Sequence, residues 1–216
     1  MTAKMPAETS PAPANDAEVR LLDSALVLFS EKGYDGTSIR EIIEMAGVTR
    51  PVLYYYFENK EDLFRRLLET RCARMTCEWD EATGSVQGLR GRLRALITTA
   101  FRQMEESPDV MRLILVMFFA PTQSGPSFDR GKLVDDRLRR IVAIMRSGLE
   151  DGELGGGDPR ALALAFSGVM DMYLMGKVRH PKARLSPELG EALVTLFLDG
   201  AASMGDVSDL VNPFHD

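Results

Sequence analysis

Apolar residues recur at helical spacing along almost the whole chain, and the sequence shows no strand-like alternation and no internal repeat. From Val19 to Phe29 the apolar side chains stand three or four residues apart, and Gly33 can then adopt the left-handed conformation that ends a helix. Further stripes follow the same spacing, up to a last one that begins after Ser186-Pro187. The pattern predicts an all-α fold of about nine helices.

One segment is ambiguous by periodicity alone, the apolar run from Val110 to Ala120. A buried helix and a buried strand look alike over that length. We predict a helix, because the chain offers no second strand to pair with it, and a loop over Pro121 to Ser127.

Composition places the chain among soluble proteins and argues against several kinds of site. The longest apolar segment, residues 161–178, contains Asp171 and Lys177, and the N-terminus lacks an apolar signal core. We therefore expect a cytoplasmic protein without membrane association. Cys72 and Cys77 lie on different sides of a helix with no histidine nearby, so neither a metal site nor a cofactor is expected.

Net charge gives no support to nucleic-acid binding. The chain of 216 residues carries a formal charge of −6, and within residues 18–60 five basic residues face seven acidic ones. An argument for DNA must rest on where individual charges lie, because phosphate contacts are local.

Two short helices joined by a tight turn are predicted between residues 38 and 57. Ser38 and Glu41 have the spacing of a capping box that starts the first helix, and Gly47 ends it. Thr49 can cap the second helix, with Pro51 in its first turn. This is a helix-turn-helix, whose second helix enters the major groove of DNA when the motif is used for recognition.

The outer face of the second helix carries side chains that have no core to fill. Arg50 and Tyr54 stand four residues apart, as do Pro51 and Tyr55, and both pairs point away from the apolar face of Leu53. Tyrosine hydroxyls can donate to phosphate oxygens, and an arginine can span two acceptors on guanine. This face therefore indicates contact with DNA, although such corners also occur as plain packing.

Two further cations could bind DNA together with the outer face of the second helix. Lys60 falls in the first turn of the next helix, where the helix dipole disfavours a positive charge unless an anion such as phosphate binds there. Arg40 could reach the groove or simply be solvated, and the sequence leaves both readings open.

Four runs of residues in this region resemble the DNA-binding region of the TetR family: Thr37-Ser38-Ile39-Arg40-Glu41-Ile42, Ala46-Gly47-Val48, Leu53-Tyr54-Tyr55-Tyr56-Phe57 and Lys60-Glu61-Asp62-Leu63. The resemblance implies that Arg40, Thr49, Arg50 and Pro51 approach bases. It implies that Ser38, Tyr54, Tyr55 and Lys60 hold phosphates. Tyr56 stands where the family often has histidine, and Arg50-Pro51 where small residues are frequent, so the operator sequence cannot be carried over.

The same resemblance implies a homodimeric regulator of transcription that leaves double-stranded operator DNA when a small effector binds. Repression is the expected sign by family analogy, and a ligand-independent DNA-binding dimer is the alternative. An enzyme is not expected, since the sequence lacks a nucleophile elbow, a phosphate loop and a metal set.

Apolar side chains in the C-terminal part could line a pocket for a largely apolar effector or could simply fill the core. The candidates are Met75, Trp79, Met104, Met111, Phe118, Met145, Phe166 and Tyr173, with Asp171 as a polar member. Core packing is the better interpretation for any single one of them. For Asp171 we favour a dimer seam or its edge, with the ligand pocket and solvent as the alternatives.

The last two helices are the predicted dimer interface, as an intermolecular four-helix bundle. The candidate contacts are Ser167, Gly168, Leu189, Leu193, Leu196 and Phe197. The expected organisation is a disordered arm over 1–16, a three-helix DNA-binding domain over 17–60, a ligand-binding and dimerisation domain over 61–205 and a flexible tail over 206–216.

Overall fold

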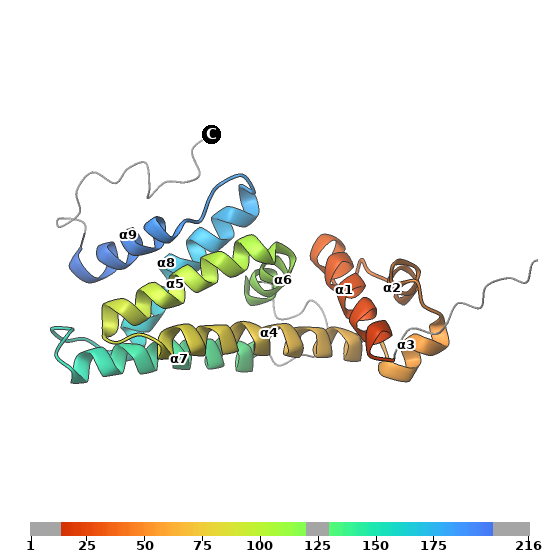
Figure 1. Cartoon of the computed structure of the whole chain (residues 1–216), viewed down its shortest axis with the longest axis horizontal. Helices are drawn as coiled ribbons and strands as arrows, with labels where there is room; N and C mark the ends of the chain where they lie inside the picture. Colours follow the sequence, from red (N-terminus) through yellow and green to blue (C-terminus); the bar gives the residue numbers. More distant parts are fainter. Residues whose placement is uncertain (1–13, 120–129, 201–216) are drawn as a thin grey trace, which may run out of the picture. The chain divides into compact units, whose positions relative to one another are not determined.

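The computed structural model describes residues 14–119 and 130–200, with side chains described over 16–115 and 135–200. Within those residues every regular element is a helix, and there are nine (Figure 1). They are α1 (Ala14–Lys32), α2 (Ile39–Ala46), α3 (Arg50–Tyr56), α4 (Lys60–Gly84), α5 (Leu89–Glu106), α6 (Pro108–Phe119), α7 (Arg130–Glu150), α8 (Pro159–Arg179) and α9 (Pro187–Asp199). The all-α prediction is confirmed, and the ambiguous run after residue 108 is a helix.

The chain divides into two compact units between Leu67 and Leu68, inside α4. The first unit is therefore longer than the 17–60 expected from the sequence. The reason is packing, because Phe64 in the second turn of α4 is buried with its ring centroid 4.9 Å from that of Phe29. At the other end α1 begins at Ala14, within the stretch expected to be an arm. The remainder of that arm, the 121–127 loop and the predicted tail lie outside the described residues.

Local capping explains where the helices of the first unit begin and end. Ser38 and Glu41 form the predicted capping box, with the Ser38 amide donating to the Glu41 carboxylate at 2.8 Å. Gly47 ends α2 with φ +61°, in the left-handed region that suits glycine. The Asn59 side chain accepts from the Asp62 amide at 2.9 Å and starts α4 as expected.

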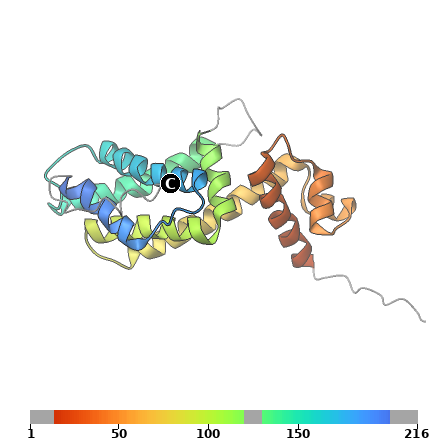
Figure 2. The ribbon, with the colours of Figure 1, turned by 90° about the horizontal axis from the view of Figure 1, so that it is seen from above.

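The second unit is a helical bundle in which α7 packs along α8 and α5 along α9 (Figures 1 and 2). Asp158 and Ser186 cap α8 and α9 through the amides of Ala161 and Leu189. Among the described helices only α8 has the length and hydropathy that crossing a bilayer would need, yet its residue Phe166 lies in the core of this bundle.

Candidate DNA-binding site

The turn between α1 and α2 and the end of α2 are fixed by contacts to backbone oxygens. The Thr37 hydroxyl, which is buried, donates to the carbonyls of Leu28 at 3.1 Å and Gly33 at 2.8 Å. An Arg20 terminal nitrogen donates to the Ala46 carbonyl at 3.0 Å. These bonds hold α2 against α1, and they position the α2–α3 corner.

One face of α3 packs inward, and the other is exposed. Leu53 is fully buried, whereas Tyr54 is 45% and Tyr55 79% exposed. Arg50 and Pro51 are exposed as well, and an Arg50 terminal nitrogen lies 3.5 Å from the Tyr54 hydroxyl. The residues predicted to face outward thus share one surface, and their hydroxyl and guanidinium groups are exposed.

Thr49 stands at the N-cap position of α3, but its side chain makes no capping hydrogen bond. Its backbone carbonyl accepts from the Val52 and Leu53 amides, so the helix starts without the hydroxyl. An exposed hydroxyl that its own helix does not use can bond to a ligand. Ser38 differs, because its hydroxyl already accepts from the Glu41 amide at 3.2 Å and donates to the Glu41 carboxylate at 2.7 Å.

Lys60 begins α4, and its ammonium lies 4.2 Å from the ring centroid of Tyr34. Burial lowers the pKa of Lys60, and burial also raises the pKa of Tyr34. The face of the Tyr34 ring attracts the Lys60 ammonium through a cation–π interaction at the start of α4. Sequence reasoning missed Tyr34, whose only signal is its place directly after the glycine that ends α1.

Arg40 is neither buried nor simply solvated. Its guanidinium pairs with the Glu44 carboxylate one turn along α2 at 2.8 Å, and this bond raises the pKa of Arg40. A second pair, Lys32 with Glu41 at 2.6 Å, stands nearby. Hydrogen bonds from Lys32 and then from Ser38 lower the pKa of Glu41 to about 2.

The residues predicted to line an effector pocket lie mostly in the core of the second unit. Those buried there are Met75, Trp79, Met104, Met111, Met145 and Phe166. Tyr173 is half-buried at the edge of that core, and the side chain of Phe118 lies outside the described residues. Asp171 pairs with Arg137 of α7 in the same chain, through two contacts of 2.7 and 2.5 Å.

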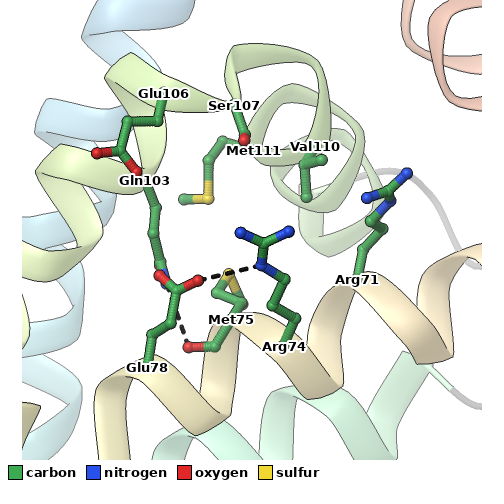
Figure 3. A pocket seen from close by; sticks show the side chains of 9 residues that line it. All are labelled: Arg71, Arg74, Met75, Glu78, Gln103, Glu106, Ser107, Val110 and Met111. Carbon is green, nitrogen blue, oxygen red and sulfur yellow. Dashed lines mark hydrogen bonds and ion pairs between the residues drawn. The ribbon is translucent and has the colours of Figure 1, made fainter. Parts of the chain in front are cut away.

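Met75 and Met111 also line a small pocket between α4, α5 and α6 (Figure 3). Its volume is about 60 Å³. Sites for drug-sized ligands measure roughly 300–1,000 Å³. The pocket in this conformation is therefore sized for a small group rather than for a whole large ligand.

The predicted interface residues divide between the interior and the surface of the second unit. Leu189 and Leu193 are buried in the chain's own core, and Ser167 is buried where it accepts a hydrogen bond from Arg137 at 2.7 Å. Leu196 and Phe197 are half-buried, and Gly168 is exposed.

Among the described residues of this unit, sequence reasoning did not select the two large apolar side chains that are most exposed. They are Leu164 at 54% and Met172 at 70%, both on α8. They lie on the same side of α8 as Gly168, at helical spacing.

Comparisons with known proteins point to one family. The pattern of the family described as "Bacterial regulatory proteins, tetR family" matches residues 21–67. The repressor KstR2 of Rhodococcus jostii is 31% identical over 104 residues, which are 45% of this chain and 51% of that protein. The activator FasR of Mycolicibacterium smegmatis is 30% identical over 102 residues, 47% of each chain. This chain thus spans about half the length of these relatives.

A solved structure extends the likeness in fold to most of the chain. The regulator FadR of Bacillus subtilis, in complex with stearoyl-CoA, superposes with a TM-score of 0.73 at 21% identity. The superposition covers 84% of this chain and 98% of that one.

The exposed α3 surface on an α2–α3 corner, followed by a helical bundle, defines a helix-turn-helix regulatory protein. Residues 21–67 carry the pattern of the TetR family of bacterial regulatory proteins, and the fold over most of the chain is that of a solved bacterial regulator. That family consists of regulators and not of enzymes.

Proposed function

We propose that the protein is a homodimeric repressor that binds a palindromic operator through α3 and leaves it when a small effector binds the second unit. The observation that carries the DNA-binding part is the outer face of α3, where Arg50, Tyr54 and Tyr55 are exposed over a buried Leu53. A large aromatic surface beside a guanidinium suits a groove edge, with the tyrosine hydroxyls on phosphates and the guanidinium on guanine.

In this proposal, the residues that contact the DNA phosphates lie at the N-termini of helices. Ser38 caps α2, Thr49 starts α3 with its hydroxyl unused, and Lys60 starts α4. Unpaired amides at helix N-termini favour phosphate, and the lysine adds a full positive charge there. Arg40 would exchange its Glu44 partner for the groove edge, so its contribution to affinity is reduced by the bond it breaks.

The dimer would form on the exposed side of α8, with Leu164, Gly168 and Met172 near the contact, and the half-buried Leu196 and Phe197 of α9 remain candidate contacts. A twofold dimer presents two α3 helices, and its operator then repeats in the same symmetry. Repression is proposed by analogy with KstR2, which is named a repressor.

Release by an effector follows as a population shift. The helix α4 contributes residues to both compact units, so a ligand that repositions its second half changes the preferred placement of the first unit. If DNA and effector favour different arrangements, linkage makes each weaken the binding of the other.

The test is selection of bound sequences from a random DNA pool with wild type, the double variant Tyr54→Ala/Lys60→Ala, and the control Arg146→Gln on α7. We expect a palindromic motif from wild type and from the control, and none from the double variant. Failure of wild type to enrich any motif at low salt, with and without cell extract, would contradict sequence-specific DNA binding.

A further inference from the structure

The pocket between α4, α5 and α6 has a wall of charged side chains and an apolar floor. Met75 from α4 and Val110 and Met111 from α6 supply the floor (Figure 3). Methionine side chains have three rotatable bonds and adapt to a group that enters. An apolar tail is therefore the part of a ligand that this floor suits.

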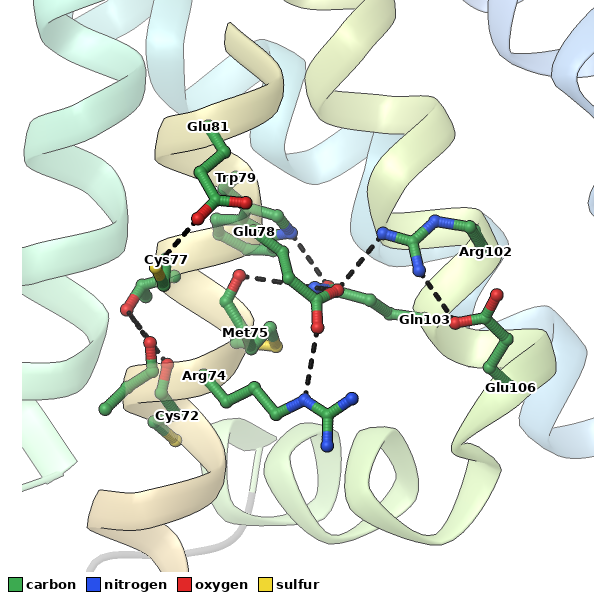
Figure 4. Close-up of polar contacts among 12 residues, drawn as sticks. Cys72, Arg74, Met75, Cys77, Glu78, Trp79, Glu81, Arg102, Gln103 and Glu106 are labelled. Carbon is green, nitrogen blue, oxygen red and sulfur yellow. Dashed lines mark hydrogen bonds and ion pairs between the residues drawn. The ribbon is translucent and has the colours of Figure 1, made fainter. Parts of the chain in front are cut away.

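A hydrogen-bond network joins α4 to α5 along one wall (Figure 4). The Gln103 side chain accepts from the Trp79 indole nitrogen at 2.8 Å and donates to the Met75 carbonyl at 3.2 Å and to the Glu78 carboxylate at 2.9 Å. The bond from Gln103 is the main cause of the lowered pKa of Glu78. Glu78 is thus ionised and already bonded.

Both carboxylates at the pocket accept a hydrogen bond from Arg102, an arginine outside the pocket lining. Arg102 donates to Glu78 at 3.1 Å and to Glu106 at 2.7 Å (Figure 4). Because Arg102 already pairs with both carboxylates, the lining offers a cationic ligand a weaker site than two free carboxylates would.

Arg74 differs from the other charged groups of the wall. Only its Nε contacts Glu78, at 3.3 Å, and its two terminal nitrogens have no hydrogen-bond partner among the described residues. Figure 3 shows this guanidinium directed into the pocket between Met75 and Met111, with Arg71 on the same side. A guanidinium with two free donors in a fork matches a carboxylate or a phosphate.

We propose that this pocket binds a small amphipathic anion, whose carboxylate or phosphate group pairs with Arg74 and whose apolar tail lies on Met75, Val110 and Met111. The inference rests on the proposed function and deepens it, because it assigns the chemical class of the effector. The small pocket volume, about 60 Å³, favours an unbranched tail that enters end-on as the methionines move aside.

The chain provides its own reporter for this site. Trp79 is the sole tryptophan, it is 1% exposed, and it bonds to the Gln103 side chain that lines the pocket. A ligand on Met75 changes the surroundings of the indole, because Gln103 bonds to both the Met75 carbonyl and the indole nitrogen. Intrinsic fluorescence therefore follows binding without a label.

The experiment titrates the purified full-length protein with octanoate, octyl phosphate and octanol, and follows Trp79 emission and the thermal midpoint. We expect the two anions to shift both signals and octanol to bind at least about tenfold more weakly, since it lacks the charge-assisted bonds. Comparison of the two anions distinguishes a carboxylate from a phosphate ester as the preferred head group.

Two variants make the assignment specific. Arg74→Gln is expected to weaken octanoate or octyl phosphate about tenfold and to leave octanol unchanged. Arg146→Gln, at an exposed arginine of α7, is the matched control and is expected to leave the affinities for the anions and for octanol unchanged. Equal binding of anions and octanol, or an unchanged anion affinity in Arg74→Gln, would overturn the proposal.

Operator affinity measured on the same samples separates this inference from the proposed function. Arg74-dependent binding of an anion that leaves operator affinity unchanged supports the site and contradicts ligand-controlled release. Loss of operator binding in all samples contradicts the proposed function, while the fluorescence titration still tests the site.

Discussion

At the scale of single residues, Lys60 is the cation whose proposed contribution to DNA binding can be isolated most cleanly. Its ammonium rests on the Tyr34 ring at the start of α4 and makes no ion pair among the described side chains. In the proposed complex Lys60 breaks no ion pair when it binds DNA, so replacing it removes one proposed phosphate contact per subunit. We expect Lys60→Gln to lower the slope of log affinity against log salt by about one for each subunit.

The measurement is operator binding by fluorescence anisotropy over a range of salt concentrations. Lys182→Gln, an exposed lysine between α8 and α9, serves as control and should leave the slope unchanged. An unchanged slope in Lys60→Gln would show that the lysine does not reach a phosphate.

Glu41 makes the stability of the first unit depend on pH. Its pKa falls from 4.5 to about 2 in the folded chain, first through the hydrogen bond from Lys32 and then through those from Ser38. A depressed carboxyl pKa stabilises the fold fully above the unfolded value of 4.5, and this stability is lost as the pH falls through about 2.

We therefore expect Glu41→Gln to unfold at a lower temperature than wild type at pH 7, and the gap to narrow below pH 4.5 and close toward pH 2. Thermal unfolding followed by circular dichroism measures it, with the exposed Glu31→Gln on α1 as control. A gap of the same size at all pH values would mean that the carboxylate charge is not what stabilises this corner.

The sequence predicts which residues share a face better than it predicts their partners. Tyr54 and Tyr55 were expected outside because helical spacing separates them from Leu53, and both are exposed. The ion pair of Arg40 with Glu44 and the position of Lys60 over Tyr34 were not predicted. Such contacts depend on side-chain rotamers and on the path of a turn, which spacing does not encode.

At the scale of elements, the last two helices also show that spacing predicts an apolar face but not what packs against it. Periodicity marked Leu189 and Leu193 as one apolar face of α9, but not whether that face meets a partner chain or its own α5. The structure packs α9 along α5 and buries both leucines. Asp171 likewise pairs with Arg137 of α7. This partner could not be predicted without knowing which helix lies beside α8.

The Asp171–Arg137 pair joins α7 to α8, with side chains only 15% and 12% exposed. Removing one partner leaves an unpaired charge at a largely buried position. We expect Asp171→Leu to lower the free energy of unfolding by about 3 kcal/mol, and Asp171→Leu/Arg137→Met to recover most of that loss. Urea unfolding gives both values.

A surface pair provides the comparison. Arg94 and Glu191 are 62% and 42% exposed, so Glu191→Ala is expected to cost no more than about 1 kcal/mol. If the double variant is no more stable than Asp171→Leu alone, the loss reflects packing rather than an unpaired arginine.

At the scale of the whole molecule, helix number and order followed from the sequence because each helix carries its own period and caps. The extent of the first unit did not, since Phe64 and Leu67 belong to α4 by sequence but are buried with the first unit. The pocket at Arg74 was beyond prediction for a related reason. A pocket is the volume that several elements leave unfilled, and it depends on their positions to within a side chain.

The proposed dimer is a property of the whole molecule, and the proposed operator binding by two α3 helices depends on it. The exposed side of α8 carries Leu164, Gly168 and Met172, a surface that a second copy could cover closely at the glycine. A glutamate in such a contact would be desolvated beside its own symmetry mate. We expect Met172→Glu to weaken dimerisation about a hundredfold without unfolding the chain, because Met172 is 70% exposed in the single chain.

Sedimentation at several concentrations measures the dimer, and binding to a full palindrome and to a half-site shows its consequence. For Met172→Glu the advantage of the full palindrome should disappear, whereas affinity for a half-site should be kept, because α3 is unchanged. Val19→Glu, at an exposed apolar position on α1, is the matched control and should remain dimeric. A dimeric Met172→Glu would place the interface elsewhere, and a monomeric variant that still prefers the palindrome would mean that the two α3 helices bind their half-sites independently of this surface.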